Sequence, residues 1–174
     1  MGCVASSVPL PPGGAPSTPL PVPGQQLWTK SASQCSGWSG HQYRFNYNGA
    51  PLAWFDGKGD HFLEFAIGHE ETNAFPNGLK GPSGRDTVQL QLLVEFAAND
   101  PRSLDVHVNG HFVGRCCVET TGSWTKAQKF EYGAVEIFRG SPVVLRLSCK
   151  HQNFPHVGSV ALVWPEKKTC RWSE

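Results

Sequence analysis

The sequence predicts an all-β protein, an antiparallel β-sandwich (jelly roll), preceded by an extended, Pro-rich N-terminal tail. Apolar residues recur at every second position in several short runs, which is the period of a strand. Gly (19 residues) and Pro (14 residues) separate these runs, so turns are frequent. No segment keeps an apolar pattern at helical spacing. With about eight strands in 174 residues, a sandwich or jelly roll is favoured over an open sheet.

The first residues match an acylation pattern. Met1-Gly2 followed by Ser6 is the acceptor pattern for N-myristoylation of Gly2 once Met1 is removed. One myristoyl chain gives only marginal membrane binding, so a second signal is needed, and palmitate on Cys3 would supply it. We therefore expect a lipoprotein that is cytoplasmic and peripheral to the inner leaflet of a membrane. The alternative is a chance Gly-Cys pair after the first Met.

Composition divides the chain into four parts. Residues 1–7 hold the acylation motif, and residues 8–24 form a linker rich in Pro and Gly. Pro favours extended polyproline II backbone, so this linker should act as a spacer. Residues 25–165 are expected to form the β-sandwich binding domain, and residues 166–174 a C-terminal tail.

Within the domain, the expected strands are short runs that alternate or are continuously apolar. Asn109-Gly110 is a two-residue hairpin signal, because both central positions of that turn need a positive φ. The long connection over residues 68–86 is either a lid on a binding face or a tolerated insertion. The principal strands are expected at residues 62–67, 88–96, 104–108, 111–113, 143–147 and 157–164.

The charge and motif content excludes several function classes. The formal net charge is +1, which argues against a general nucleic-acid binder. No Gly-x-Ser-x-Gly, P-loop or Gly-x-Gly-x-x-Gly motif is present, so we expect no enzyme and no cofactor. Cys116 and Cys117 are adjacent in an expected strand, where their side chains should point to opposite faces and not share a metal ion.

Four segments, in order, resemble the carbohydrate-binding modules of families 6 and 35. Those modules carry a Gly-Asp-aromatic-Leu-Glu-aromatic strand, a strand ending in Ala-Asn, a strand ending in Val-Asn-Gly, and a Thr-Gly-x-Trp loop. The matching segments here are residues 59–65, 93–99, 104–110 and 121–124. The resemblance covers residues 28–164 and implies a galactose-binding-like β-sandwich with one sugar site in the loops at one end.

The resemblance also implies which residues would bind a glycan or another hydroxyl-rich ligand. Aromatic rings stack on the apolar face of a pyranose, and fixed polar groups select its hydroxyl pattern. Trp124 is equally consistent with a core residue at one end of the sandwich, whereas Trp28, Trp38 and Trp164 are expected in the core. The carried-over carbohydrate-binding positions are Trp54, Phe55, Trp124, Asn153 and His156.

Departures from the family pattern lead to an alternative function. The modules hold a structural calcium through carboxylates of the first and closing strands, but the closing Asp position is Gly158 here and the first strand offers no carboxylate. Calcium needs several oxygen ligands, so we expect no metal site. The alternative is a structural adaptor that uses the β-sandwich for protein–protein interaction at a membrane or in a large assembly.

Overall fold

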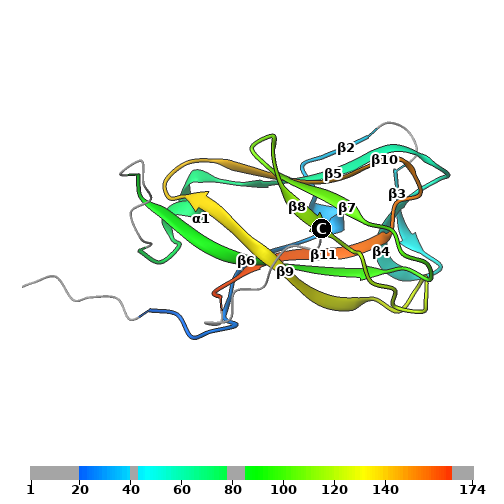
Figure 1. Ribbon diagram of the computed structural model, residues 1–174, viewed down its shortest axis with the longest axis horizontal. Helices are drawn as coiled ribbons and strands as arrows, with labels where there is room; N and C mark the ends of the chain where they lie inside the picture. The colour runs from blue at the N-terminus through cyan, green and yellow to red at the C-terminus, as the bar shows by residue number, and fades with distance from the viewer. Residues whose placement is uncertain (1–19, 40–42, 78–84, 166–174) are drawn as a thin grey trace, which may run out of the picture.

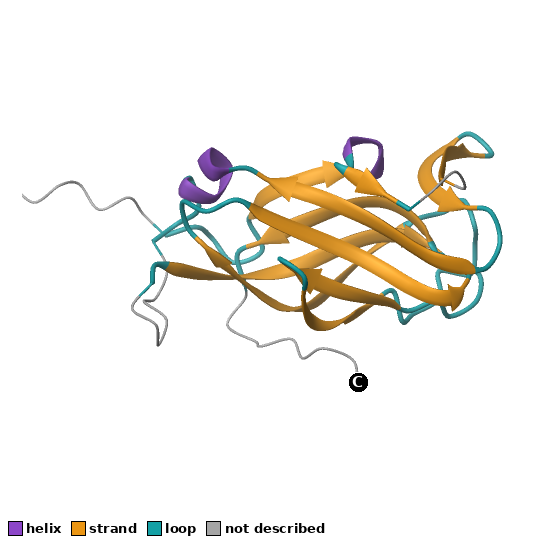
Figure 2. Ribbon diagram, turned by 90° about the horizontal axis from the view of Figure 1, so that it is seen from above, coloured by secondary structure: helices purple, strands orange, loops and turns teal. Residues whose placement is uncertain are grey.

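Two antiparallel sheets pack face to face in the computed structural model, which describes residues 20–39, 43–77 and 85–165 (Figure 1, Figure 2). This arrangement confirms the predicted all-β sandwich. Gly2 and Cys3, most of the linker and the tail from residue 166 lie outside the described residues. None of the helices in the described part has the length and hydropathy to cross a bilayer.

The first sheet has strand order β3-β4-β11-β6-β9, and β1 pairs with β11 beside β4. β6 and β9 make its longest pair, which runs from Thr87 opposite Phe138 to Phe96 opposite Gln128. The strands are β1 (Gln26–Ser31), β3 (Tyr43–Tyr47), β4 (Ala50–Phe55), β6 (Thr87–Ala97), β9 (Gln128–Phe138) and β11 (His156–Val163).

The second sheet has strand order β2-β5-β10-β7-β8. Its strands are β2 (Gly37–Trp38), β5 (Gly59–Ile67), β7 (Leu104–Val108), β8 (His111–Cys116) and β10 (Val143–Gln152). Short helical segments η1 (Ala32–Gln34) and α1 (His69–Asn73) follow β1 and β5.

The core lies between the sheets because inward and outward residues alternate along each strand. In β5, Leu63, Phe65 and Ile67 point inward and are at most 1% exposed. Phe96 of β6 and Phe154 of the β10–β11 loop belong to the same buried core cluster. Burying one such side chain stabilises the fold by about 1.5–3 kcal/mol, so the alternation sets the register of each strand.

The predicted Asn109-Gly110 turn is confirmed. Asn109 has φ 50° and Gly110 has φ 81°, and Val108 of β7 pairs with His111 of β8 across the turn. The Asn109 side chain also accepts a hydrogen bond from the Val144 amide at 2.8 Å. This hairpin is therefore attached to β10 as well as closed on itself.

Two expectations about single residues are wrong. Cys116 and Cys117 do not point to opposite faces: both are fully buried, with their Sγ atoms 3.7 Å apart. Strand β8 ends at Cys116, and Cys117 adopts φ 57°, so the alternation of the strand stops between them. Trp38 is 48% exposed rather than in the core, because β2 is a two-residue edge strand and its ring stacks on Tyr43 at 5.0 Å.

Candidate functional site

Several connections meet at one end of the sandwich, on the side labelled β3 and β4 in Figure 1 and away from α1. They are the β3–β4 turn and the loops at residues 98–103, 117–127 and 153–155. Thr121 ties two of these loops together, because its backbone N–H donates to the Ala98 carbonyl at 2.8 Å. The Thr121 hydroxyl also accepts from the Ala98 amide at 3.0 Å. The loops at residues 98–103 and 117–127 are therefore held together at this rim.

Four aromatic side chains gather on this rim, and we call them the rim cluster: Tyr47, Trp54, Trp124 and His156. The His156 ring is central, with ring-centroid distances of 4.1 Å to Tyr47, 5.2 Å to Trp124 and 6.0 Å to Trp54. Tyr47 and Trp54 meet edge to face at 5.1 Å. Trp54 and Trp124 are both partly buried residues, neither fully enclosed nor fully exposed.

His156 is 6% exposed, and its hydrogen bond defines its chemistry. Its Nδ1 lies 2.8 Å from the Trp124 carbonyl oxygen. A carbonyl only accepts, so Nδ1 carries the proton and Nε2 of the neutral ring is an acceptor. Burial lowers the pKa of His156; the nearby Arg102 charge lowers it further, and the bond to Trp124 opposes both. The neutral ring is thus the stable form at neutral pH.

The structure brings together most of the residues predicted from the sequence. Trp54, Trp124 and His156 belong to the rim cluster, and Asn153 is partly exposed in the adjoining β10–β11 loop. Trp124 also packs partly against the core, as one of its two interpretations expected. Phe55 lies elsewhere: it is 5% exposed, stacked on His61 at 4.6 Å and edge to face with Phe154 at 4.9 Å.

Tyr47 is a rim residue that the sequence interpretation missed, although a signal for it exists. It precedes Asn48-Gly49, which adopt φ values of 47° and 82° in the turn between β3 and β4. This is the same two-residue hairpin signal as Asn109-Gly110. A tyrosine beside such a turn is carried to the tip of its hairpin, where it meets the rim loops.

The closing-strand calcium carboxylate of the family pattern has no counterpart at Gly158. Among the described residues, no group of three His, Cys, Asp or Glu side chains could hold a metal ion. At Gly158, a Cβ atom would meet Leu52 Cδ2 at 3.2 Å and Glu95 Cγ at 3.3 Å. The closing-strand backbone therefore approaches its neighbours too closely for an Asp side chain to enter without a shift.

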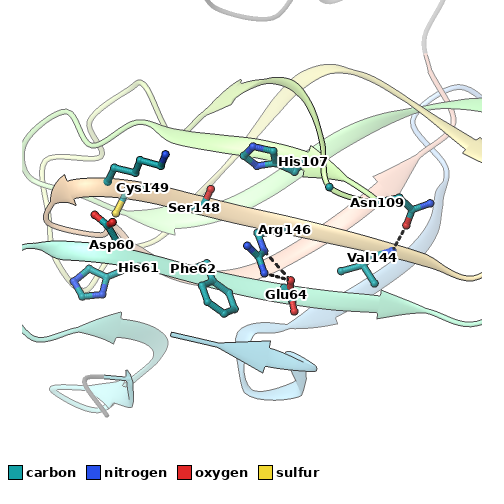
Figure 3. Close-up of a pocket in the computed structure, with 12 residues that line it drawn as sticks. Asp60, His61, Phe62, Glu64, His107, Asn109, Val144, Arg146, Ser148 and Cys149 are labelled. Carbon is teal, nitrogen blue, oxygen red and sulfur yellow. Dashed lines mark hydrogen bonds and ion pairs between the residues drawn. The ribbon is translucent and has the colours of Figure 1, made fainter. Parts of the chain in front are cut away.

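A separate groove lies on the outer face of the second sheet, over β5, β10 and β7 (Figure 3). Its volume is about 560 Å³, within the usual size range of ligand pockets. Arg146 spans it: Nε donates to Glu64 at 2.7 Å and the guanidinium covers the Phe62 ring at 4.2 Å. His107 Nδ1 is buried there without a hydrogen-bond partner among the described residues. The groove therefore has a mixed polar and apolar lining, and Arg146 covers one face of its Phe62 ring.

Comparisons with known proteins show a shared fold. No protein-family model and no curated protein matches the sequence. Among solved structures, a family 6 module from the lichenase 5A of Cellvibrio mixtus, in complex with cellotriose, matches with a TM-score of 0.57 at 14% identity over 82% of this chain and 100% of that one. A family 35 module from an environmental isolate matches with a TM-score of 0.56 at 12% identity, over 79% and 93%.

A family 6 module from Clostridium cellulolyticum, in complex with xylose, gives a TM-score of 0.54 at 14% identity, over 80% of this chain and 100% of that one. The fold is thus that of these carbohydrate-binding modules, in agreement with the sequence resemblance.

Proposed function

We propose that this chain is a non-catalytic carbohydrate-binding domain that holds a glycan, or another hydroxyl-rich ligand, on the rim cluster. The observation that carries the proposal is the gathering of two partly exposed tryptophans, Trp54 and Trp124, around one buried neutral histidine. The shared fold with family 6 and 35 modules supports it.

The chemistry of the rim cluster suits a sugar. An indole ring offers an apolar face to the axial C–H groups of a pyranose, while its N–H can donate to a hydroxyl. His156 Nε2 provides an acceptor for a hydroxyl of the ligand, and Asn153 adds an amide in the adjoining loop. The groove is the weaker stacking site, because Phe62 is the one Phe, Tyr or Trp among the described residues that line it, whereas the rim cluster has two tryptophans.

Calorimetric titration with cellotriose and xylose, preceded by a glycan-array screen, tests this function. Trp54→Ala and Trp124→Ala should each weaken binding about tenfold, since an aromatic contact adds up to about 1.5 kcal/mol beyond its buried area. Trp38→Ala is the matched control, because Trp38 is an exposed tryptophan outside the rim cluster. Absence of binding to every sugar, or equal effects of all three substitutions, would refute the proposal.

We also propose that acylation of Gly2, with palmitate on Cys3, tethers the domain to the inner face of a membrane. The Met1-Gly2-x-x-x-Ser6 pattern and the neighbouring thiol support this. Intact-mass measurement of protein from eukaryotic cells should show the added myristoyl mass, and Gly2→Ala should remove it. An unmodified Gly2 amine would contradict the tether and leave the sugar proposal standing.

The second candidate function is an adaptor that binds a protein through the sandwich. Exposed apolar side chains favour it: Phe112 is 58% exposed on β8, and Val144 is 37% exposed at the edge of the groove. Affinity capture followed by mass spectrometry discriminates the two functions. A stoichiometric protein partner that is lost with Phe112→Ser, but kept with Trp124→Ala, would support the adaptor.

A further inference from the structure

Arg102 lies in the β6–β7 loop, beside the rim cluster, and contacts both other loops of the rim. Its guanidinium stands 4.0 Å from the centre of the Trp124 ring, in the β8–β9 loop. One terminal nitrogen donates to the Phe154 carbonyl at 3.1 Å, in the β10–β11 loop. A single side chain thus links three separate loops.

Asp100, in the same β6–β7 loop, fixes the orientation of this guanidinium. Nε donates to Asp100 Oδ1 at 2.6 Å, and the other terminal nitrogen lies 3.4 Å from Asp100 Oδ2. The Arg102 side chain is 16% exposed, whereas that of Asp100 is 58% exposed. A planar cation held by a carboxylate fork and a carbonyl has little freedom to rotate, so it presents a constant face to the indole.

The Trp124 ring also contacts the His156 ring, at a centroid distance of 5.2 Å. Its backbone carbonyl accepts the hydrogen bond from His156, and its ring packs partly against the core. The surrounding loop, residues 117–127, has no strand partner of its own. Cation–π contact with Arg102 therefore acts together with these contacts to restrain the plane of the ring.

We infer that Arg102 is a positioning residue for sugar binding: it holds the Trp124 ring in the orientation in which the rim cluster receives its ligand. This inference rests on the proposed function. A ring held in place before binding loses less freedom when a ligand stacks on it, so affinity rises without any contact between Arg102 and the sugar. Arg102 then acts through Trp124 and not on its own.

The first test needs no ligand. In ¹⁵N-labelled full-length protein, the indole N–H relaxation of Trp124 is compared between wild type, Arg102→Ala and Arg102→Lys. Arg102→Ala should lower the order parameter of the Trp124 indole while leaving that of Trp54 unchanged. Lys keeps the charge but lacks the planar fork, so Arg102→Lys should recover only a small part of the order.

The second test is a double-mutant cycle with cellotriose as the titrant. Arg102→Ala should weaken binding roughly threefold or more in the wild-type background, the range of a partly exposed cation–π contact. In the Trp124→Ala background the same substitution should have no effect, because the ring through which it acts is gone. Arg115→Ala is the matched control, since Arg115 pairs with Asp105 on the outer sheet face at 3.0 Å.

The outcomes separate this inference from the proposed function. If no sugar binds, the proposed function fails, and the indole relaxation still decides whether Arg102 orders Trp124. Unchanged order in Arg102→Ala, or full recovery by Arg102→Lys, overturns the inference, as does an equal effect of Arg102→Ala with and without Trp124. If Arg102→Ala does not fold, Arg102→Lys, which retains the charge, provides the comparison.

Discussion

At the scale of single residues, His156 makes the stability of the protein depend on pH. Burial lowers its pKa in the folded state, whereas the unfolded chain titrates near the ordinary value of about 6.5. Above that value both states are neutral and the full stability is present. As the pH falls below it, the unfolded chain binds the proton more readily, so the free energy of unfolding decreases.

We therefore predict a stability loss between pH 7 and pH 5 that depends on His156. Urea unfolding at several pH values should give a smaller loss for His156→Gln than for wild type, because the other titrating groups are common to both. Cellotriose affinity should decline only at lower pH, once the folded protein itself binds the proton, since protonation turns the Nε2 acceptor into a donor. If the free energy of unfolding depends on pH identically in the two proteins, the folded state does not resist protonation of His156.

The residues of the site were predictable to different degrees. Trp54, Trp124 and His156 follow from the resemblance, because they occupy positions in the order of segments where the family pattern has ligand-binding residues. Phe55 could not be separated from Trp54 by that means: adjacent strand residues face opposite sides, and only pairing shows that Phe55 faces Phe154. Arg102 was missed because its role depends on three loops that lie far apart in sequence.

At the scale of elements, the β7–β8 hairpin depends on the backbone of Gly110. Its φ of 81° lies in the left-handed region, and a Cβ there would meet nothing within 4 Å. Gly110→Ala should therefore destabilise through backbone strain alone, by about 1–2 kcal/mol. For a chain of this size each 1 kcal/mol lowers Tm by roughly 2–4 °C, which calorimetry can measure.

Ser141→Ala is the control for that substitution. Ser141 is exposed in the neighbouring β9–β10 turn and does not have a positive φ. Its replacement should change the free energy of unfolding by no more than about 0.5 kcal/mol. Equal losses in the two variants would mean that the turn conformation at Gly110 is not the source of the effect.

At this scale, strands in which apolar and polar residues alternate strongly were predictable from the sequence. Strands that depend on pairing with a neighbouring strand were not. The run at residues 104–108 matches β7, and the run at 88–96 lies within β6 (Thr87–Ala97). In contrast, β9 (Gln128–Phe138) was not identified, since its first half carries charged and exposed residues and its pairing with β6 sustains it. Edge strands such as β2 are too short to show any period.

At the scale of the whole molecule, the rim cluster and the first described residues of the chain lie at opposite ends of the sandwich. Leu20 and Val22, near the start of the described chain, line a cavity at the α1 end of the sandwich (Figure 1). The same cavity is lined by Asn73, the last residue of α1, and by Phe75, which follows it. The last strand also finishes there, where the Trp164 amide donates to the Gln25 carbonyl at 2.8 Å. An attachment through the residues before Leu20 would thus not occupy the rim end of the sandwich.

This geometry predicts that the point of attachment controls ligand access. A biotin acceptor peptide placed before Met1 should allow the immobilised protein to bind a soluble glycan as tightly as it does in solution. The same peptide inserted between Asn48 and Gly49, at the tip of the β3–β4 hairpin, should abolish glycan binding. Immobilisation there places the sensor surface beside Tyr47 and so blocks the rim cluster. Surface plasmon resonance compares the two, with circular dichroism to verify that both are folded. If both attachments bind equally well, the ligand lies away from the rim, and the groove over β5 and β10 becomes the site to test.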